Sequence, residues 1–353
     1  MSTATATLTG DSLEPGFGKH AVLTKIPSHT PCNSYSAPAK SLKVPEPPAP
    51  YFTASWHHDM DSAIKNVDQY FLDRWNFTSE KARKKFVAAG FSRVTCMYFP
   101  MALDDRIEFA CKLLTVLFLI DDLLEDMSFE DGEAYNASLM PIMRGDKQPD
   151  RSVPAESIMW DLWEDMRACD RELADQILEP TFVFMRAQTD RARNNIKGLG
   201  AYLLYRERDV GKALLSALMR FSMNLRLTPE ELQIVRPIDE NCSKHLSIIN
   251  DIYSFEKELV QSQVGHEEGS VLCTGVKVLA DEAGLTIEAS KRLLLAMARE
   301  WELTHFKLAE EIGRDERVPA DRKDAVARYI TGLELQMSGN ELWSTSTLRY
   351  SEV

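Results

Sequence analysis

Residues 113–126 decide the fold: the run Leu113-Leu114-Thr115-Val116-Leu117-Phe118-Leu119-Ile120 leads directly into Asp121-Asp122-Leu123-Leu124-Glu125-Asp126. The apolar residues of the first run recur at the three- and four-residue spacing of a helix face. We therefore predict a buried helix whose C-terminal end carries carboxylates. Carboxylates at this end oppose the helix macrodipole, which favours cations there, so a bound cation would relieve the conflict.

Helical spacing of apolar residues continues from Asp59 to the C-terminus, for example at Leu173 and Ile177, whereas the alternating pattern of strands is nearly absent. In Thr228-Pro229-Glu230 we expect the threonine to cap a helix whose first residue is proline. Breakers expected to separate helices are Pro141, Gly145, Pro149 and Pro154. The predicted fold class is all-α, with one domain over residues 53–353 and no internal repeat.

Residues 1–52 form the one clear break in composition. They are rich in Ser, Thr, Ala and Pro, and they include Pro45-Glu46-Pro47-Pro48-Ala49-Pro50. Such a composition is a poor basis for a packed core, so we predict a flexible N-terminal tail.

Composition sets limits on function. The chain has 353 residues, of which 44% are hydrophobic, and can bury a large core. Its formal charge of −13, from 41 basic and 54 acidic residues, argues against nucleic acid and anionic membranes as partners. No apolar run reaches the roughly 20 residues that span a bilayer, so we expect no stable membrane insertion. The cysteines show no metal-binding spacing, which favours reduced core residues of a cytoplasmic protein: Cys32, Cys96, Cys111, Cys169, Cys242 and Cys273.

Asn250, Ser254 and Glu258 are four residues apart from one to the next in the stretch 250–258. In a helix this spacing places a carboxamide, a hydroxyl and a carboxylate on one face over about two turns. Hard oxygen ligands of this kind suit Mg²⁺, which usually completes its shell with waters and substrate phosphates. By itself either this triplet or the acidic cluster has an ordinary explanation as a solvated polar helix face. Two oxygen-rich segments facing one cavity would form a diphosphate–metal site.

Basic and aromatic residues add to this hypothesis. Arg206 precedes Asp209 and Gly211, a glycine that is suited to interrupting a helix, and Arg349-Tyr350 lies near the C-terminus. Arginine's planar donor fork suits phosphate oxygens, although a surface charge patch would explain each segment equally well when taken alone. Aromatic residues that would line such a site, or otherwise belong to the core, are Tyr98, Phe118, Phe184 and Trp343.

Taken together, these segments resemble the class I terpene synthases. The cluster from Asp121 to Asp126 is similar to their aspartate-rich motif, and Asn250, Ser254 and Glu258 match their Asn/Ser/Glu metal motif in order and spacing. Arg206 with Asp209 and Gly211 resembles the diphosphate-sensing segment, and Arg349-Tyr350 the C-terminal arginine-tyrosine pair. Further runs between residues 66 and 350, such as Gln336-Met337-Ser338-Gly339-Asn340, are similar to fungal aristolochene synthases.

The resemblance implies a helical bundle around a central active-site cavity, in which farnesyl diphosphate is cyclised to a bicyclic eremophilane-type hydrocarbon with release of diphosphate. Three Mg²⁺ ions would be held by Asp121, Asn250, Ser254 and Glu258, with Glu125 as a water-mediated contributor. The residues implied to grip the diphosphate are Arg206, Lys257, Arg349 and Tyr350. The aromatic wall of Phe118, Phe184, Trp343 and Tyr98 would exclude water and stabilise carbocations. A homodimer is left open as the assembly.

One departure and three alternatives remain at this stage. Asp126 stands where the close relatives carry histidine, so its carboxylate either shifts a metal ligand or faces solvent. The alternatives are a different sesquiterpene product, a prenyl-chain-elongating synthase and a non-catalytic isoprenoid-binding protein. A prenyl-chain-elongating synthase would carry a second aspartate-rich motif where this chain has Asn250, Ser254 and Glu258. A binding protein has no need of Arg206 and Arg349 beside two acidic clusters.

Overall fold

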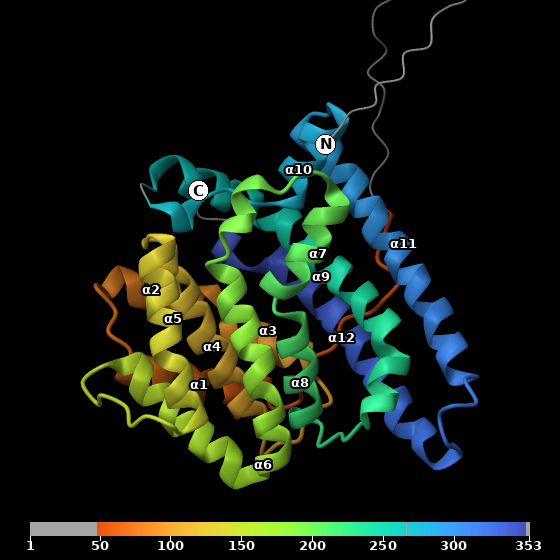
Figure 1. Cartoon of the computed structure of the whole chain (residues 1–353), viewed down its shortest axis with the longest axis horizontal. Helices are drawn as coiled ribbons and strands as arrows, with labels where there is room; N and C mark the ends of the chain where they lie inside the picture. Colours follow the sequence, from red (N-terminus) through yellow and green to blue (C-terminus); the bar gives the residue numbers. More distant parts are fainter. Residues whose placement is uncertain (1–47, 266, 351–353) are drawn as a thin grey trace, which may run out of the picture. The chain divides into compact units, whose positions relative to one another are not determined.

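The computed structural model describes residues 48–265 and 267–350, and these residues are almost wholly helical (Figure 1). No strand occurs among them, which confirms the predicted all-α class. The first α-helices are α1 (Met60–Arg74), α2 (Glu80–Ala89), α3 (Phe91–Tyr98), α4 (Ile107–Leu124), α5 (Phe129–Arg144) and α6 (Pro154–Gln188). They are followed by α7 (Leu199–Asp209), α8 (Lys212–Ser222), α9 (Pro229–Val264), α10 (Gly275–Ala283), α11 (Ile287–Gly313) and α12 (Lys323–Ser346). Short 3₁₀ helices are η1 (Arg191–Asn195), η2 (Glu268–Ser270), η3 (Ala320–Arg322) and η4 (Leu348–Tyr350).

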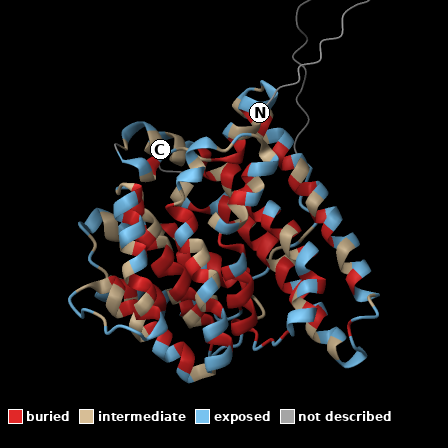
Figure 2. Ribbon diagram, in the orientation of Figure 1, coloured by how far each residue is buried: buried red, intermediate tan, exposed pale blue. Residues whose placement is uncertain are grey.

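The apolar helix predicted from residues 113–120 is α4, and all residues of that run except the half-buried Phe118 are buried. It packs against α1, α3 and α6, while α12 packs against both α3 and α9, so α3 lies between α4 and the C-terminal helices in the contact network. Figure 2 shows the buried residues concentrated on the inward faces of the bundle. Because α4 ends at Leu124 and Glu125 caps it, its carboxylates emerge where the buried face of the helix stops.

Among the helix boundaries predicted from the sequence, the position of Pro141 is the exception. The Thr228 side chain accepts a hydrogen bond from the Glu231 backbone, and Pro229 is the first residue of α9, as predicted. Pro154 likewise begins α6. The prediction that Pro141 separates helices is wrong, because Pro141 lies inside α5. The helix continues for one more turn and stops at Gly145, whose left-handed conformation (φ 87°) ends it more effectively.

Gly211 divides what would otherwise be one helix into α7 and α8. Its φ of +71° lies in the left-handed region that favours glycine. A Cβ at this position would also come within 3.1 Å of the Phe184 ring, which packs against the break. The glycine therefore both turns the chain and makes room for an aromatic ring.

Most of the predicted tail, and Cys32 with it, falls outside the described residues. Residues 48–52 are described, and they contact α11: Arg299 Nε donates to the Pro48 carbonyl (3.0 Å), and Phe52 packs against His305 and Phe306. The five described cysteines form no disulfide. None of the described helices combines the length and apolar character that crossing a membrane requires.

Candidate active site

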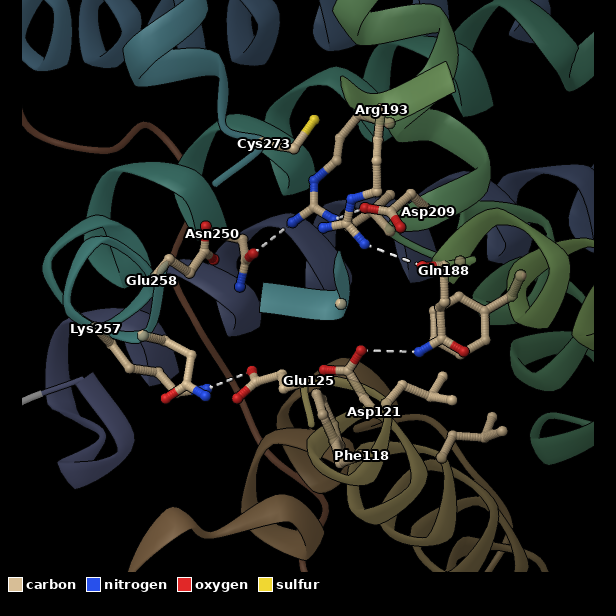
Figure 3. A pocket seen from close by; sticks show the side chains of 18 of the residues that line it. Phe118, Asp121, Glu125, Gln188, Arg193, Asp209, Asn250, Lys257, Glu258 and Cys273 are labelled. Carbon is tan, nitrogen blue, oxygen red and sulfur yellow. Dashed lines mark hydrogen bonds and ion pairs between the residues drawn. The ribbon is translucent and has the colours of Figure 1, made fainter. Parts of the chain in front are cut away.

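The C-terminal end of α4 and the middle of α9 face each other across a cavity (Figure 3). In this view Phe118, Asp121 and Glu125 rise from α4, and Asn250, Lys257 and Glu258 reach in from α9. Every predicted site residue except Ser254 lines the cavity: Tyr98, Phe118, Asp121, Glu125, Phe184, Arg206, Asn250, Lys257, Glu258, Trp343, Arg349 and Tyr350. The fold therefore gathers residues from seven helical segments into one site.

The α4 wall of the cavity is acidic. Asp121 Oδ1 accepts a hydrogen bond from the Gln188 side-chain amide (2.8 Å), and Glu125 pairs with Lys257 (2.9 Å). Burial, followed by repulsion from Glu125 and Asp122, raises the pKa of Asp121 to about 6. Although burial alone would raise the pKa of Asp122 too, the Arg349 guanidinium at 2.7 Å lowers it below its ordinary value. Asp126 is exposed and does not line the cavity, as expected for a carboxylate that faces solvent.

The α9 wall carries the Asn/Ser/Glu triplet on one helix face, at the spacing that the sequence predicts. Asn250 Oδ1 accepts from Arg206 (2.7 Å), and its Nδ2 donates to the Tyr350 hydroxyl (2.7 Å). Ser254 is buried behind the cavity surface, and its hydroxyl lies 2.6 Å from Glu258 Oε1. Each side chain of the triplet therefore has at least one hydrogen bond to a neighbouring polar group of the protein itself.

The basic residues of the site are paired with its acids. Arg206 forms an ion pair with Asp209 and a longer one with Asp251 (3.3 Å), and Arg349 contacts Asp122 with both terminal nitrogens. Burial alone would lower the pKa of Arg349, but the nearby Asp122 carboxylate outweighs this effect and raises that pKa. These cations consequently remain charged inside the protein.

Aromatic and aliphatic side chains line the rest of the cavity. Phe118 stacks on Phe91 with a centroid distance of 4.6 Å, and Trp343 packs edge-on against Tyr350. The Tyr98 hydroxyl donates to Asn340 (2.8 Å), which keeps its polar group satisfied within an apolar surface. Aliphatic lining residues are Leu114, Leu117, Leu214 and Leu215. The cavity thus combines a charged part, called the mouth below, with an apolar part, called the floor.

The structure adds residues that the motifs did not assign. Gln188 and Arg193 line the cavity, and buried Asp251 accepts hydrogen bonds from Tyr202 (2.6 Å) and the Gly275 backbone (2.8 Å). Burial is the main cause that raises the pKa of Asp251 to about 6, while Arg206 lowers it in part. Asp251 has one signal in the sequence, its position beside Asn250, but Gln188 and Arg193 carry none because their place depends on tertiary packing.

The donor set fits a hard divalent cation. Asp121 and Glu258 lie on opposite walls, and neither has a basic side chain within ion-pair distance in the described part of the chain. The carboxylates of Asp121, Asp122 and Glu125 also offer oxygens within 4.8 Å of one another. Oxygen ligands of this kind are those that Mg²⁺ prefers. A cation bound here would neutralise charge that the protein leaves uncompensated.

Comparison with known proteins gives a consistent result. The family model for terpene synthase family 2, C-terminal metal binding, matches residues 112–302, which include both walls of the cavity. The chain is 64% identical to an aristolochene synthase from Aspergillus terreus, over 87% of this chain and 95% of that protein. It is 54% identical to the aristolochene synthase of Penicillium roqueforti, over 99% of this chain and all of that protein. A crystal structure of aristolochene synthase from Penicillium roqueforti superimposes with a TM-score of 0.76 at 56% identity, covering 85% of this chain and 99% of that one.

Proposed function

The chain belongs to the terpene synthase family, and we propose that it is a sesquiterpene synthase that cyclises farnesyl diphosphate to aristolochene. The observation that carries this proposal is the continuity of the cavity, in which an oxygen-rich, cation-rich mouth opens onto an aromatic floor. A substrate with a diphosphate head and an apolar tail matches this division. The identities of 64% and 54% to aristolochene synthases support the choice of product.

Three Mg²⁺ ions, in our proposal, would be held by Asp121 on one wall and by Asn250, Ser254 and Glu258 on the other, with Glu125 contributing through water. When bound, they supply positive charge that stabilises the departing diphosphate. The hydrogen bonds of Asn250 with Arg206 and of Ser254 with Glu258 support this assignment, because they hold the Asn250 and Glu258 oxygens at the cavity, with Ser254 directly behind them, before ligand arrives.

Arg206, Lys257, Arg349 and Tyr350 bind the diphosphate in this proposal. Each of the three cations is now held by a carboxylate of the same site, namely Asp209, Glu125 and Asp122 respectively. Recruitment of these cations to phosphate oxygens requires them to exchange partners, so substrate binding and closure of the mouth are coupled. Charge on the leaving group is then stabilised in a site from which water is excluded.

The apolar floor handles the hydrocarbon. Departure of diphosphate leaves an allylic carbocation, which water would quench, and the faces of Phe118, Phe184 and Trp343 stabilise such cations by cation–π attraction. Tyr98 contributes its ring while its hydroxyl stays bound to Asn340. The same aromatic and aliphatic side chains hold the farnesyl chain in a folded conformation, so that its two ends can react with each other.

The test is to incubate the purified protein with farnesyl diphosphate and Mg²⁺ and to identify the volatile products by gas chromatography and mass spectrometry. Aristolochene as the main product is the expected result, and another cyclic sesquiterpene would retain the reaction class but overturn the product. A second incubation with isopentenyl diphosphate distinguishes chain elongation. Binding without turnover would leave only a non-catalytic isoprenoid-binding protein.

We also propose a cytoplasmic location, and we leave a homodimer open as the assembly. The unpaired state of the described cysteines supports the first proposal, since oxidising compartments favour disulfides. Fractionation of the source cells tests the location, and light scattering on the eluted protein tests the assembly.

A further inference from the structure

Arg193 occupies an unusual position in the active site. It lies in η1, the short helix that follows α6, and its side chain lines the cavity beside Gln188 and Asp209 (Figure 3). None of the sequence motifs described above includes it. Its guanidinium therefore adds a positive charge that the reaction scheme has not used.

The guanidinium of Arg193 is poorly satisfied by the protein. Its Nη1 donates to the Gln188 backbone carbonyl (3.0 Å), while its Nε is buried without a hydrogen-bond partner. Over residues 48–265 and 267–350 no carboxylate lies within ion-pair distance of it. The nearby Asp190 is already engaged, because it accepts from the Ala192 backbone (2.9 Å) and pairs with Arg208 (3.3 Å).

The other basic residues at the mouth differ in this respect. Arg206, Lys257 and Arg349 each have a carboxylate partner, at Asp209, Glu125 and Asp122. Those three cations must leave a partner before they bind an anion. Arg193 has no such partner to leave, so it is prepared for an anion before metal or substrate arrives.

The charge of Arg193 persists despite its surroundings. Burial alone would lower its pKa, but the field of Asp209, which lies beyond ion-pair distance, outweighs burial and raises that pKa. The folded protein therefore stabilises the charged form of Arg193, although no carboxylate lies within ion-pair distance of it in the described residues. A charged side chain that lines a cavity without a direct partner is typical of a binding site.

We propose that Arg193 binds the diphosphate group, as a fifth protein contact beside Arg206, Lys257, Arg349 and Tyr350. The proposal rests on the function proposed above, since it presumes a diphosphate ligand at this mouth. Diphosphate is the anion that the site favours, because the planar donor fork of arginine binds phosphate oxygens in pairs. The group recognised is the same whether it belongs to the substrate or to the released inorganic diphosphate.

Isothermal titration calorimetry with Mg²⁺ and inorganic diphosphate tests the proposal directly. In Arg193→Gln we expect the Kd to rise roughly tenfold or more, as for loss of a hydrogen bond between charged groups. Arg193→Lys keeps the charge but not the fork, and its Kd should fall between those of the wild type and Arg193→Gln. The matched control is Arg191→Gln, which removes the same charge from an exposed position in the same short helix and should leave the Kd unchanged.

Thermal unfolding separates binding from a structural role. Without ligand, Arg193→Gln should unfold near the wild-type temperature, because Arg193 forms no ion pair that the substitution would break. With Mg²⁺ and diphosphate, the stabilisation seen in the wild type should be reduced. An unchanged Kd for Arg193→Gln would overturn the proposal, and so would a loss of stability without ligand accompanied by full ligand stabilisation.

Turnover of farnesyl diphosphate then identifies the stage at which Arg193 acts. A raised KM assigns the contact to the substrate, whereas weaker inhibition by inorganic diphosphate at unchanged KM assigns it to the product. Because the calorimetry uses inorganic diphosphate, it is independent of the farnesyl chain. Failure of the wild type to turn over farnesyl diphosphate would overturn the proposed reaction and leave the Arg193 result intact.

Discussion

Two clusters of charged side chains in this protein look alike but differ in what holds them. The mouth cluster consists of Asp121, Asp122, Glu125, Arg206, Lys257, Glu258 and Arg349 around the cavity. The sealed cluster consists of His245, Arg299, Glu302 and Glu341, all of them buried between α9, α11 and α12. Both contain several carboxylates close enough together to hold a metal ion. Acidic side chains alone therefore do not distinguish a metal site from a structural one.

The difference lies in which carboxylates have a cation. In the sealed cluster Arg299 bridges Glu302 and Glu341, and His245 lies 3.1 Å from Glu302. Residues 48–51 close this cluster, since Pro48 accepts from Arg299 and the Tyr51 backbone donates to Glu302 (2.6 Å). At the mouth, by contrast, Asp121 has an amide and Glu258 a hydroxyl as hydrogen-bond partners. Uncompensated negative charge marks the mouth as the cluster that needs a cation from solution.

The largest expected effect comes from removing one of these uncompensated carboxylates. We expect Glu258→Ala to lower kcat/KM roughly a thousandfold or more, because a metal ligand contributes several kcal/mol to transition-state stabilisation. Its unfolding temperature should stay near that of the wild type, since the Ser254 hydroxyl keeps its bond to the Asn250 carbonyl (2.8 Å). Steady-state kinetics and thermal unfolding measure both.

The control for this prediction is Asp126→Asn, which removes an exposed acidic charge next to the cluster and should leave turnover near the wild-type rate. Excess EDTA should abolish turnover of the wild type. Full activity in EDTA would show that the mouth cluster, like the sealed cluster, does not need a metal ion.

The second prediction concerns the sealed cluster, where we expect a substitution to lower stability and leave turnover unchanged. Arg299→Met leaves Glu302 and Glu341 buried without their guanidinium, so we expect the free energy of unfolding to fall by about 3 kcal/mol. Turnover per folded molecule should stay near the wild-type value because Arg299 does not line the cavity. Chemical denaturation provides the measurement. Arg314→Met, which breaks an exposed ion pair with Glu310 on the same helix, should cost less than about 1 kcal/mol.

These two clusters also show what the sequence can predict. Asn250, Ser254 and Glu258 were predictable because four-residue spacing in one helix is a local property, and Asp121 because the apolar run before it is local too. The partners of these residues were not predictable. The contacts of Arg206 with Asn250 and of Arg349 with Asp122 join segments far apart in the chain, and the burial of Ser254 behind the cavity surface depends on how α9 is rotated. The sealed cluster, gathered from three helices, has no sequence pattern at all.

The third prediction concerns movement at the mouth. Arg349 now contacts Asp122, and Tyr350 contacts Asn250, so ligand and metal must rearrange the C-terminal segment. With Mg²⁺ and diphosphate at about 100 times Kd, binding stabilises the closed form by about 2.7 kcal/mol. We expect backbone amides between Asn340 and Tyr350 to exchange hydrogen up to about 100-fold more slowly, as measured by mass spectrometry.

The sealed cluster provides the reference for this measurement. Peptides around Glu302 should show unchanged exchange, because their partners do not depend on ligand. Equal protection of both regions would indicate general stabilisation of the fold, and no change at the C-terminus would exclude that segment from ligand binding.

The smallest effect is expected at the aromatic floor, which meets the mouth at Trp343. Replacing Trp343 by leucine removes a π face that we expect to stabilise a late carbocation by about 1 to 2 kcal/mol. It also removes the indole donor to the Ala89 carbonyl (3.3 Å), but Thr347 donates to the same oxygen (3.1 Å), so no acceptor is orphaned. The ionising groups at the mouth are untouched. We therefore expect substrate consumption to fall far less than in Glu258→Ala, while monocyclic and acyclic hydrocarbons increase among the products.

Trp343→Phe separates the two roles of the indole, because it keeps an aromatic face and loses the donor. If the π face matters, Trp343→Phe should retain most of the wild-type product spectrum and Trp343→Leu should not. Identical spectra and rates for the wild type and Trp343→Leu would make Trp343 an ordinary core residue, and the stabilisation of cations would then have to come from Phe118 and Phe184.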